Sequence, residues 1–214
     1  NVPLLCLMIW SGLLVYWAND IYPGFFPAWF YTAFAIKSRL AEGMWVHFLI
    51  GWLFVLNGIG YLIYLAASGH WRELAPSWSA FKALPATILH DMGLQKEAPP
   101  QGKFNAAQRF AYSGAIFLGV AGVLTGFAIY KPVQLGWLLK MFGGYEAARA
   151  IHFFAMLALV LFIPMHLVQV MRAGWTEFRA MVGFSRASAA ALIGGLVLVS
   201  GIWMVMRGAE QIND

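Results

Sequence analysis

The most constraining feature of this sequence is a set of five apolar stretches that carry at most one charged residue each. A helix needs about 20 mostly apolar residues to cross a hydrocarbon core of roughly 30 Å, and a helix satisfies its own backbone hydrogen bonds there. The stretches therefore predict an all-α integral membrane protein that forms one transmembrane domain over residues 1–214. The predicted spans are Val2–Ala18, Met44–Ala67, Ala107–Tyr130, Ala148–Met171 and Ala187–Met206.

The composition excludes several other classes of protein. Hydrophobic residues make up 61% of the chain and charged residues 11%, which excludes a disordered protein. The single cysteine, Cys6, excludes a disulfide scaffold. The net charge of +5 is spread between apolar blocks and forms no basic patch, so we expect contact with membrane lipids and no nucleic acid.

The sequence begins at Asn1 without an initiator methionine, and the first predicted span is short. We therefore expect its first turn or turns to precede Asn1. A secretory signal is the competing interpretation, but no small-residue cleavage site follows this span. With the N-terminus placed inside, eight Lys and Arg residues fall on the inner side and six on the outer side, which favours this orientation for a multi-pass membrane protein.

Two of the connections between spans carry recognisable patterns. The outer connection, residues 19–43, is rich in aromatic residues, which suits a segment in the membrane interface or under a partner protein. The inner connection, residues 68–103, contains an amphipathic stretch from Trp78 to Leu94 followed by a polar run.

Three histidines, His47, His152 and His166, fall within predicted spans, where an ionisable side chain is costly and indicates function. His152 and His166 are 14 residues apart on the fourth span, so they lie about 21 Å apart along the axis and on nearly the same helix face. His47 lies about one turn into the second span. Because the second and fourth spans start on the same side of the membrane, His47 and His152 are expected at one depth.

Two imidazoles at one depth on neighbouring helices suit axial ligation of a haem iron. A zinc ion needs four ligands, and the sequence shows no cluster of Cys, His and carboxylates to supply them. Covalent haem attachment is excluded because no CxxCH motif occurs. His166 would then need a partner at the inner level. His70 is one candidate, but it lies about 34 Å of helix beyond His47, and a histidine upstream of Asn1 is the favoured one.

These histidines, together with the stretch that opens the third span, resemble a known family. The stretch reads Lys103-Phe104-Asn105-Ala106-Ala107-Gln108-Arg109. It is similar to the di-haem cytochrome b subunits of formate dehydrogenase (gamma subunit), nickel-iron hydrogenase and thiosulfate-reductase-type complexes. The resemblance covers roughly residues 1–184 and implies a four-helix haem-binding transmembrane bundle in the bacterial inner membrane. The predicted fifth transmembrane helix, Ala187–Met206, is added to this bundle and is absent from the four-helix formate dehydrogenase version.

The resemblance also implies two haem b groups and a quinone. It assigns the outer haem to His47 and His152, and the inner haem to His166 and a histidine that the given residues lack. The family's quinone pocket lies near the inner haem, where Lys103, Asn105 and Gln108 cluster as polar donors for a quinone carbonyl. Capping of the third span and contact with lipid headgroups is the alternative role of these three residues.

Two other features remain open between a cofactor role and a structural role. Arg149 lies one turn before His152 and either pairs with a haem propionate or anchors the span at the interface. A stripe of small residues on the third span would let a macrocycle lie flat against it, but helix packing explains the stripe as well. The stripe consists of Ala115, Gly119, Gly122 and Gly126.

The sequence thus predicts a membrane cytochrome b that carries electrons between a periplasmic redox subunit or cytochrome c and the quinone pool. It would be the electron-transfer subunit of an oxidoreductase complex, with quinone reduced or quinol oxidised at its inner face and with no catalytic residue that makes bonds on its own. The alternative from another class is a haem-free structural subunit or a small transporter, although the inverted repeats typical of transporters are missing.

Overall fold

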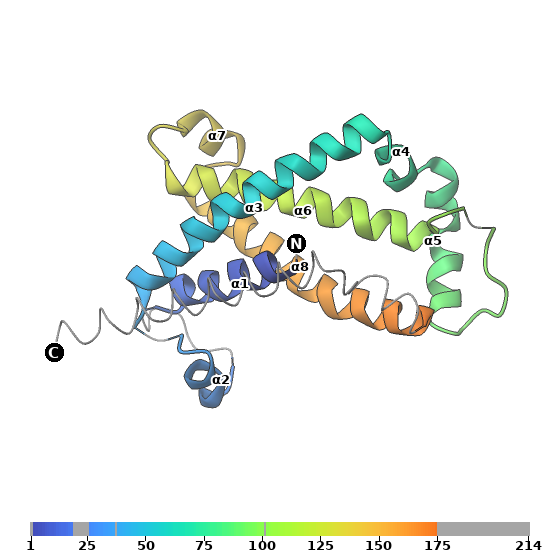
Figure 1. The fold of residues 1–214 in the computed structure, drawn as a ribbon, viewed down its shortest axis with the longest axis horizontal. Helices are drawn as coiled ribbons and strands as arrows, with labels where there is room; N and C mark the ends of the chain where they lie inside the picture. Colours follow the sequence, from blue (N-terminus) through green and yellow to red (C-terminus); the bar gives the residue numbers. More distant parts are fainter. Residues whose placement is uncertain (1, 19–25, 37, 101, 175–214) are drawn as a thin grey trace, which may run out of the picture. The chain divides into compact units, whose positions relative to one another are not determined.

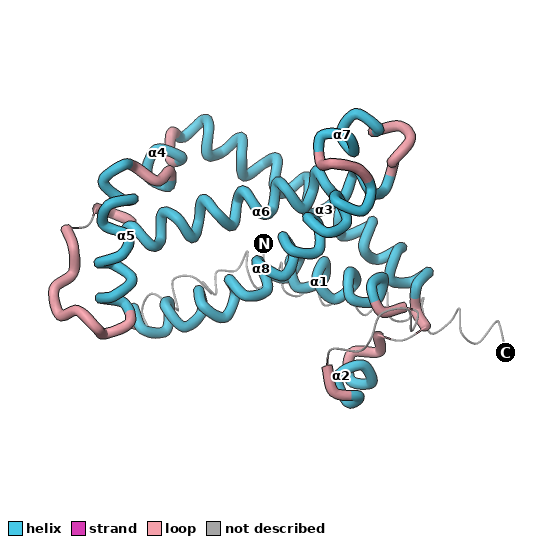
Figure 2. Tube along the Cα trace, turned by 180° about the vertical axis from the view of Figure 1, so that it is seen from behind, coloured by secondary structure: helices cyan, strands magenta, loops and turns pink. Residues whose placement is uncertain are grey.

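The computed structural model describes residues 2–18, 26–36, 38–100 and 102–174, and these residues form helices and loops only (Figure 2). The predicted all-α class is therefore confirmed. The described helices are α1 (Val2–Tyr16), α2 (Ala28–Ala33), α3 (Leu40–Ser68), α4 (Trp71–Leu74), α5 (Trp78–Asp91), α6 (Ala106–Tyr130), α7 (Gly136–Met141) and α8 (Tyr145–Ala173).

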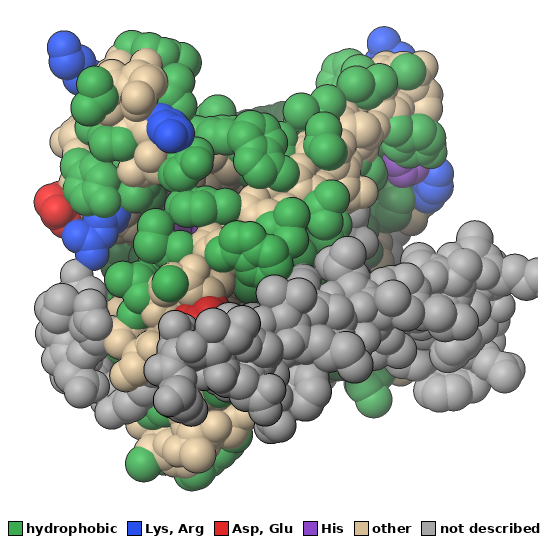
Figure 3. All heavy atoms as spheres, turned by 60° about the vertical axis from the view of Figure 1, so that its left-hand side comes forward, with side chains coloured by type: hydrophobic (Ala, Val, Ile, Leu, Met, Phe, Trp, Pro, Cys, Tyr) green, Lys and Arg blue, Asp and Glu red, His purple; other side chains and the backbone are tan. Residues whose placement is uncertain are grey.

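Three of these helices, α3, α6 and α8, are long and apolar enough to cross a membrane, and α1 is a shorter apolar helix. These four helices occupy the first four predicted spans, and α3 begins four residues before its predicted span. The fifth predicted span, Ala187–Met206, lies outside the described residues. Hydrophobic side chains cover much of the described surface on the face drawn in Figure 3, as expected where lipid is the solvent.

The chain divides into two compact units, which are described separately. One comprises residues 1–54 and 165–214, and the other comprises residues 55–164. The expectation of one transmembrane domain stays a prediction.

In the first unit, α2 packs against the end of α1 through an aromatic and aliphatic core. Leu14, Tyr31 and Ile36 form its buried centre, with partly buried tryptophan and phenylalanine side chains around them. The indole of Trp10 donates to the carbonyl of Phe34 at 3.1 Å, and the amide of Ser38 donates to the carbonyl of Ala18 at 3.1 Å. These bonds attach the α2 segment to the end of α1.

In the second unit, α6 is the central element (Figure 1). Helix α7 lies against its C-terminal end, and α4 and α5 lie against its N-terminal end. Ala128, Leu138 and Ala148 are buried together where α6, α7 and the start of α8 meet. At the other end, the hydroxyl of Ser113 donates to the carbonyl of Leu74 at 2.9 Å. Helix α5 corresponds to the predicted amphipathic stretch.

Candidate haem-ligand sites

His47 lies on α3 and its ring faces α1 in the first unit. The Nδ1 atom of His47 is 3.0 Å from the hydroxyl oxygen of Ser11, and this serine is fully buried. The hydroxyl of Ser11 also donates to the carbonyl of Leu7, one helical turn earlier, at 2.7 Å. The contact with Leu7 is the shortest that this hydroxyl makes, so we assign its single proton to the Leu7 carbonyl and the Nδ1–H of His47 as the donor to the Ser11 oxygen.

Gly12, which follows Ser11, faces the imidazole of His47. A Cβ atom placed on Gly12 would lie 3.5 Å from Cε1 and 3.8 Å from Nδ1 of His47. The ring therefore packs directly on the backbone of α1 beside Gly12, with its Nδ1 edge turned to Ser11.

His152 lies on α8 and its ring faces α6 in the second unit. Its Nδ1 atom is 3.0 Å from the carbonyl oxygen of Gly122 and 3.1 Å from the hydroxyl oxygen of Thr125. A carbonyl can only accept, so Nδ1 of His152 carries a hydrogen. Thr125 is fully buried and donates its own proton to the carbonyl of Ala121 at 2.6 Å, so its oxygen also accepts from His152.

A glycine again follows the hydroxyl residue. A Cβ atom placed on Gly126 would lie only 3.2 Å from Cε1 of His152. The predicted small-residue stripe on the third span thus has a specific use at Gly122 and Gly126, since one supplies a carbonyl to His152 and the other supplies space for its ring.

The two histidines therefore meet the same arrangement, a hydroxyl residue followed by glycine on a neighbouring helix. We call Ser11–Gly12 and Thr125–Gly126 the hydroxyl–glycine pairs. In both, Nδ1 of the imidazole carries the hydrogen, so in the neutral ring the lone pair lies on Nε2, which is a tautomer suited to metal ligation. The sequence analysis missed Ser11, Gly12 and Thr125, and the only signal for them is a small hydroxyl residue followed by glycine within an apolar helix.

His47 belongs to the first unit and His152 to the second, and their ligation of one iron stays a prediction. His166 is half-buried on α8, within the part of that helix that belongs to the first unit. Among the described residues, no group of three or more His, Cys, Asp and Glu side chains could hold a metal ion. A porphyrin iron, which needs only one or two axial donors from the protein, fits this donor set better than a metal ion bound by side chains alone.

The predicted quinone-binding residues lie at the start of α6, where two of them cap the helix. The side-chain oxygen of Asn105 accepts a hydrogen bond from the backbone N–H of Gln108 at 2.7 Å. The side-chain oxygen of Gln108 accepts one from the backbone N–H of Asn105 at 3.0 Å. This reciprocal pair is a capping box, which satisfies two backbone donors at the helix start. Asn105 and Gln108 therefore cap α6, as the alternative interpretation predicted, and they do so through their side-chain oxygen atoms.

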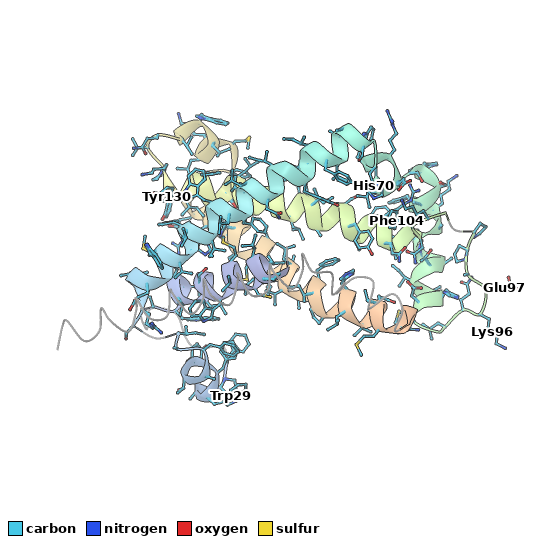
Figure 4. All side chains as sticks on the ribbon, in the orientation of Figure 1. Trp29, His70, Lys96, Glu97, Phe104 and Tyr130 are labelled. Carbon is cyan, nitrogen blue, oxygen red and sulfur yellow. The ribbon has the colours of Figure 1, made fainter. Side chains whose placement is uncertain are left out.

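Lys103 forms part of an exposed cluster with α4. Its ammonium donates to Oε2 of Glu73 at 2.6 Å, and Nδ1 of His70 lies 2.7 Å from the same oxygen. The ring of Phe104 meets the ring of His70 edge-on at 6.0 Å, and Figure 4 shows the two side chains close together. The hydrogen bond from Lys103 is the main cause that lowers the pKa of the Glu73 carboxyl.

Arg149 stands at the beginning of α8, one turn before His152. Its guanidinium donates to Oε2 of Glu146 at 3.2 Å and lies 6.0 Å from the centre of the Tyr145 ring. Both contacts are local to the first turn of the helix. They suit an interfacial anchor and leave a contact with a haem propionate as a prediction.

The chain is similar to known proteins over most of its length. The pattern of the prokaryotic cytochrome b561 family matches residues 1–184. A relative from Azospira oryzae, named as a subunit (YedZ1) of a protein-methionine-sulfoxide reductase, is 33% identical over 165 residues, which is 77% of this chain and 80% of that protein. No solved structure matches the chain.

The family match confirms the resemblance to membrane cytochromes b that the histidines and the opening of the third span indicated. It also agrees with the all-helical structure and its apolar membrane-crossing helices. The chain therefore belongs to the prokaryotic cytochrome b561 family, the multi-pass haem b proteins that transfer electrons in the bacterial inner membrane.

Proposed function

We propose that this chain is a di-haem cytochrome b that carries electrons between a periplasmic redox partner and the quinone pool. The observation that carries the proposal is that His47 and His152, each on a membrane helix, have Nδ1–H bound by a buried hydroxyl. A histidine that ligates a metal through Nε2 commonly donates its other ring N–H in this way. The haems supply reversible one-electron chemistry, and the chain supplies imidazoles of the correct tautomer.

The outer haem is assigned to His47 and His152. The sequence supports the pairing because both residues lie about one turn into spans that start on the same side of the membrane. The hydroxyl–glycine pairs support each histidine as a ligand separately, because each pair orients one ring through its Nδ1 edge. Arg149, one turn from His152, is a candidate for contact with a propionate of this haem.

The pairing can be tested by haem content in three variants of the purified protein. His47→Ala and His152→Ala should each remove the same haem, which is about half of the total if two haems bind. His90→Ala is the matched control, because His90 lies at the end of α5, outside the membrane spans, beside Asp91. A pyridine-haemochrome assay measures the content, and full haem in both ligand variants would contradict the assignment.

A second haem is assigned to His166, with its other ligand outside the described residues. His166 lies 14 residues after His152 on one continuous helix, so it presents a second imidazole about 21 Å further along α8. His166→Ala should remove the haem that survives in His47→Ala, and the double variant should be free of haem. A wild-type protein without any haem would instead make the chain a structural subunit or a transporter.

Quinone is proposed to bind at the start of α6, near Lys103, Asn105 and Gln108. The capping box does not conflict with this role, because it uses the oxygen atoms of Asn105 and Gln108. A quinone carbonyl needs donors, and each of these side chains has an NH₂ group for that purpose. The exposed ammonium of Lys103 adds a charged donor, although Glu73 shares it.

The capping role and the quinone role of Asn105 can be separated by choosing variants that keep the cap. Asn105→Asp keeps an N-cap oxygen and loses the NH₂ group, whereas Asn105→Ala loses both. If Asn105 donates to quinone, both variants should lower quinone affinity by roughly five- to a hundredfold, since a buried carbonyl loses about 1–3 kcal/mol. If Asn105 only caps the helix, Asn105→Asp should exchange electrons with quinone at the wild-type rate.

The redox partner is proposed to be a periplasmic oxidoreductase subunit, with cytochrome c as the alternative. The relative from Azospira oryzae is named as a subunit of a reductase, and a reductase consumes electrons. A similar partner here would draw electrons outward from quinol, whereas a partner that oxidises its substrate would send them inward to quinone. The two directions of electron flow can be distinguished by mixing quinol with the oxidised protein in nanodiscs and following haem reduction. Only outward flow requires that quinol reduce the haems rapidly.

A further inference from the structure

The hydroxyl–glycine pairs have a consequence for the redox properties of the protein. We propose that Ser11 and Thr125 are positioning residues that hold His47 and His152 through Nδ1–H and lower the reduction potential of the haem that these histidines ligate. The inference rests on the proposed ligation by His47 and His152. It adds two residues that neither contact iron nor stand out in the sequence.

The direction of the hydrogen bonds follows from the helix backbone. Each hydroxyl donates its proton to a carbonyl of its own helix, Ser11 to Leu7 at 2.7 Å and Thr125 to Ala121 at 2.6 Å. The oxygen then has only lone pairs to offer to the imidazole. Each hydroxyl is thus fixed as an acceptor for Nδ1–H.

The burial of both hydroxyls makes these contacts specific. Ser11, Thr87 and Thr125 are the buried serine and threonine residues in the described part of the chain. Thr87 donates to the carbonyl of Ala83 at 2.9 Å on α5, in the same back-bonding geometry. Thr87 therefore provides a matched control for the loss of a buried hydroxyl in a helix outside the membrane spans.

An acceptor on Nδ1–H changes what the imidazole does to a bound iron. It increases electron density on the ring and makes Nε2 a stronger donor, which stabilises the ferric state over the ferrous state. Loss of the acceptor should therefore raise the reduction potential. For His152 the rise is limited, because the carbonyl of Gly122 still accepts from Nδ1–H in the absence of the Thr125 hydroxyl.

The test uses redox titration of the purified full chain, followed by its haem absorption bands, with haem content and low-spin EPR signals as further readouts. Ser11→Ala and Thr125→Val should both keep their haem. Of the two midpoint potentials, one should rise, and it should be the same one in both variants. That potential should belong to the haem that is missing in His47→Ala. Thr125→Ser should restore the wild-type potential because it keeps the hydroxyl, and Thr87→Val should leave both potentials in place.

The possible outcomes separate this inference from the ligand assignment. Unshifted potentials and EPR signals in Ser11→Ala and Thr125→Val would overturn the role of the hydroxyls, even if His47→Ala loses its haem as expected. Full haem in His47→Ala would instead overturn the ligand assignment. If Ser11→Ala fails to fold, the limited upward shift expected in Thr125→Val and its absence in Thr125→Ser decide, because valine matches threonine in shape and serine keeps its oxygen.

Discussion

Among the described glycines, Gly126 leaves the least space between a helix backbone and a predicted haem ligand. A Cβ atom there would lie 3.2 Å from Cε1 of His152, which is closer than ordinary contact, and 3.6 Å from Nδ1 of the same ring. Gly126→Ala should therefore push the ring away from α6 and lengthen its hydrogen bond to Thr125. We expect partial loss of the outer haem or an altered low-spin EPR signal, measured on the purified protein.

Two other glycines control for the general effect of adding a methyl group. At Gly12 the added Cβ would stand 3.5 Å from His47, an ordinary contact, so Gly12→Ala should keep its haem. At Gly119, on the same helix as Gly126, it would meet no other described atom within 4 Å. Gly119→Ala should keep its haem and gain helix stability. Equal haem loss at positions 119 and 126 would contradict the steric argument.

The histidines could be predicted from the sequence, but the residues that hold them could not. An ionisable side chain in a membrane span is rare enough that His47, His152 and His166 stand out. Ser11 and Thr125 do not, because small hydroxyl residues are common in membrane helices and satisfy themselves on their own backbone. Their role depends on which helix face lies opposite, and spacing along one helix does not contain that information.

At the scale of the element, the start of α6 depends on its capping box. Asn105→Ala removes the acceptor for the Gln108 amide and should cost about 0.5–2 kcal/mol of helix stability. Asn105→Asp and Asn105→Ser should retain most of that stability. Hydrogen exchange of the amides in the first turn of α6 measures the effect, and equal protection in Asn105→Ala and wild type would show that the cap is dispensable.

The hydrogen bond between Lys103, just before α6, and Glu73 of α4 links these two segments, and its strength should depend on pH through Glu73. Since the pKa of Glu73 is lowered, chiefly by the hydrogen bond from Lys103, the ionised carboxyl stabilises the link above the usual pKa of a glutamate. The link is lost as the pH falls through the lowered pKa. Hydrogen exchange around α4 should show this transition, which should vanish in both Lys103→Ala and Glu73→Gln because each variant removes one partner of the link.

The apolar stretches were sufficient to predict the long helices but not the short ones. Hydropathy identifies the membrane-crossing helices because the bilayer sets their length. The four- to six-residue helices α2, α4 and α7 were not predicted, since their formation depends on contacts with longer helices. The burial of Leu138 in α7 against Ala128 of α6 is such a contact.

At the scale of the whole molecule, the orientation in the membrane determines which haem meets which partner. The excess of Lys and Arg on the inner side is eight against six, a small difference, so orientation needs a direct measurement. The chain is convenient for this purpose because Cys6 is its only cysteine. A Cys6→Ser background allows single cysteines to be placed in the connections on either side.

We expect a cysteine at Val133 to react with a membrane-impermeant maleimide in intact cells stripped of their outer membrane, because the α6–α7 connection is predicted to be periplasmic. Val133 is 87% exposed, so its side chain is accessible. A cysteine at Lys96, in the exposed loop after α5 (Figure 4), should react only after the inner membrane is broken. Labelling of Lys96→Cys but not Val133→Cys in unbroken cells would reverse the orientation. The His47 and His152 level would then face the cytoplasm, and quinone exchange near Asn105 would occur at the periplasmic surface.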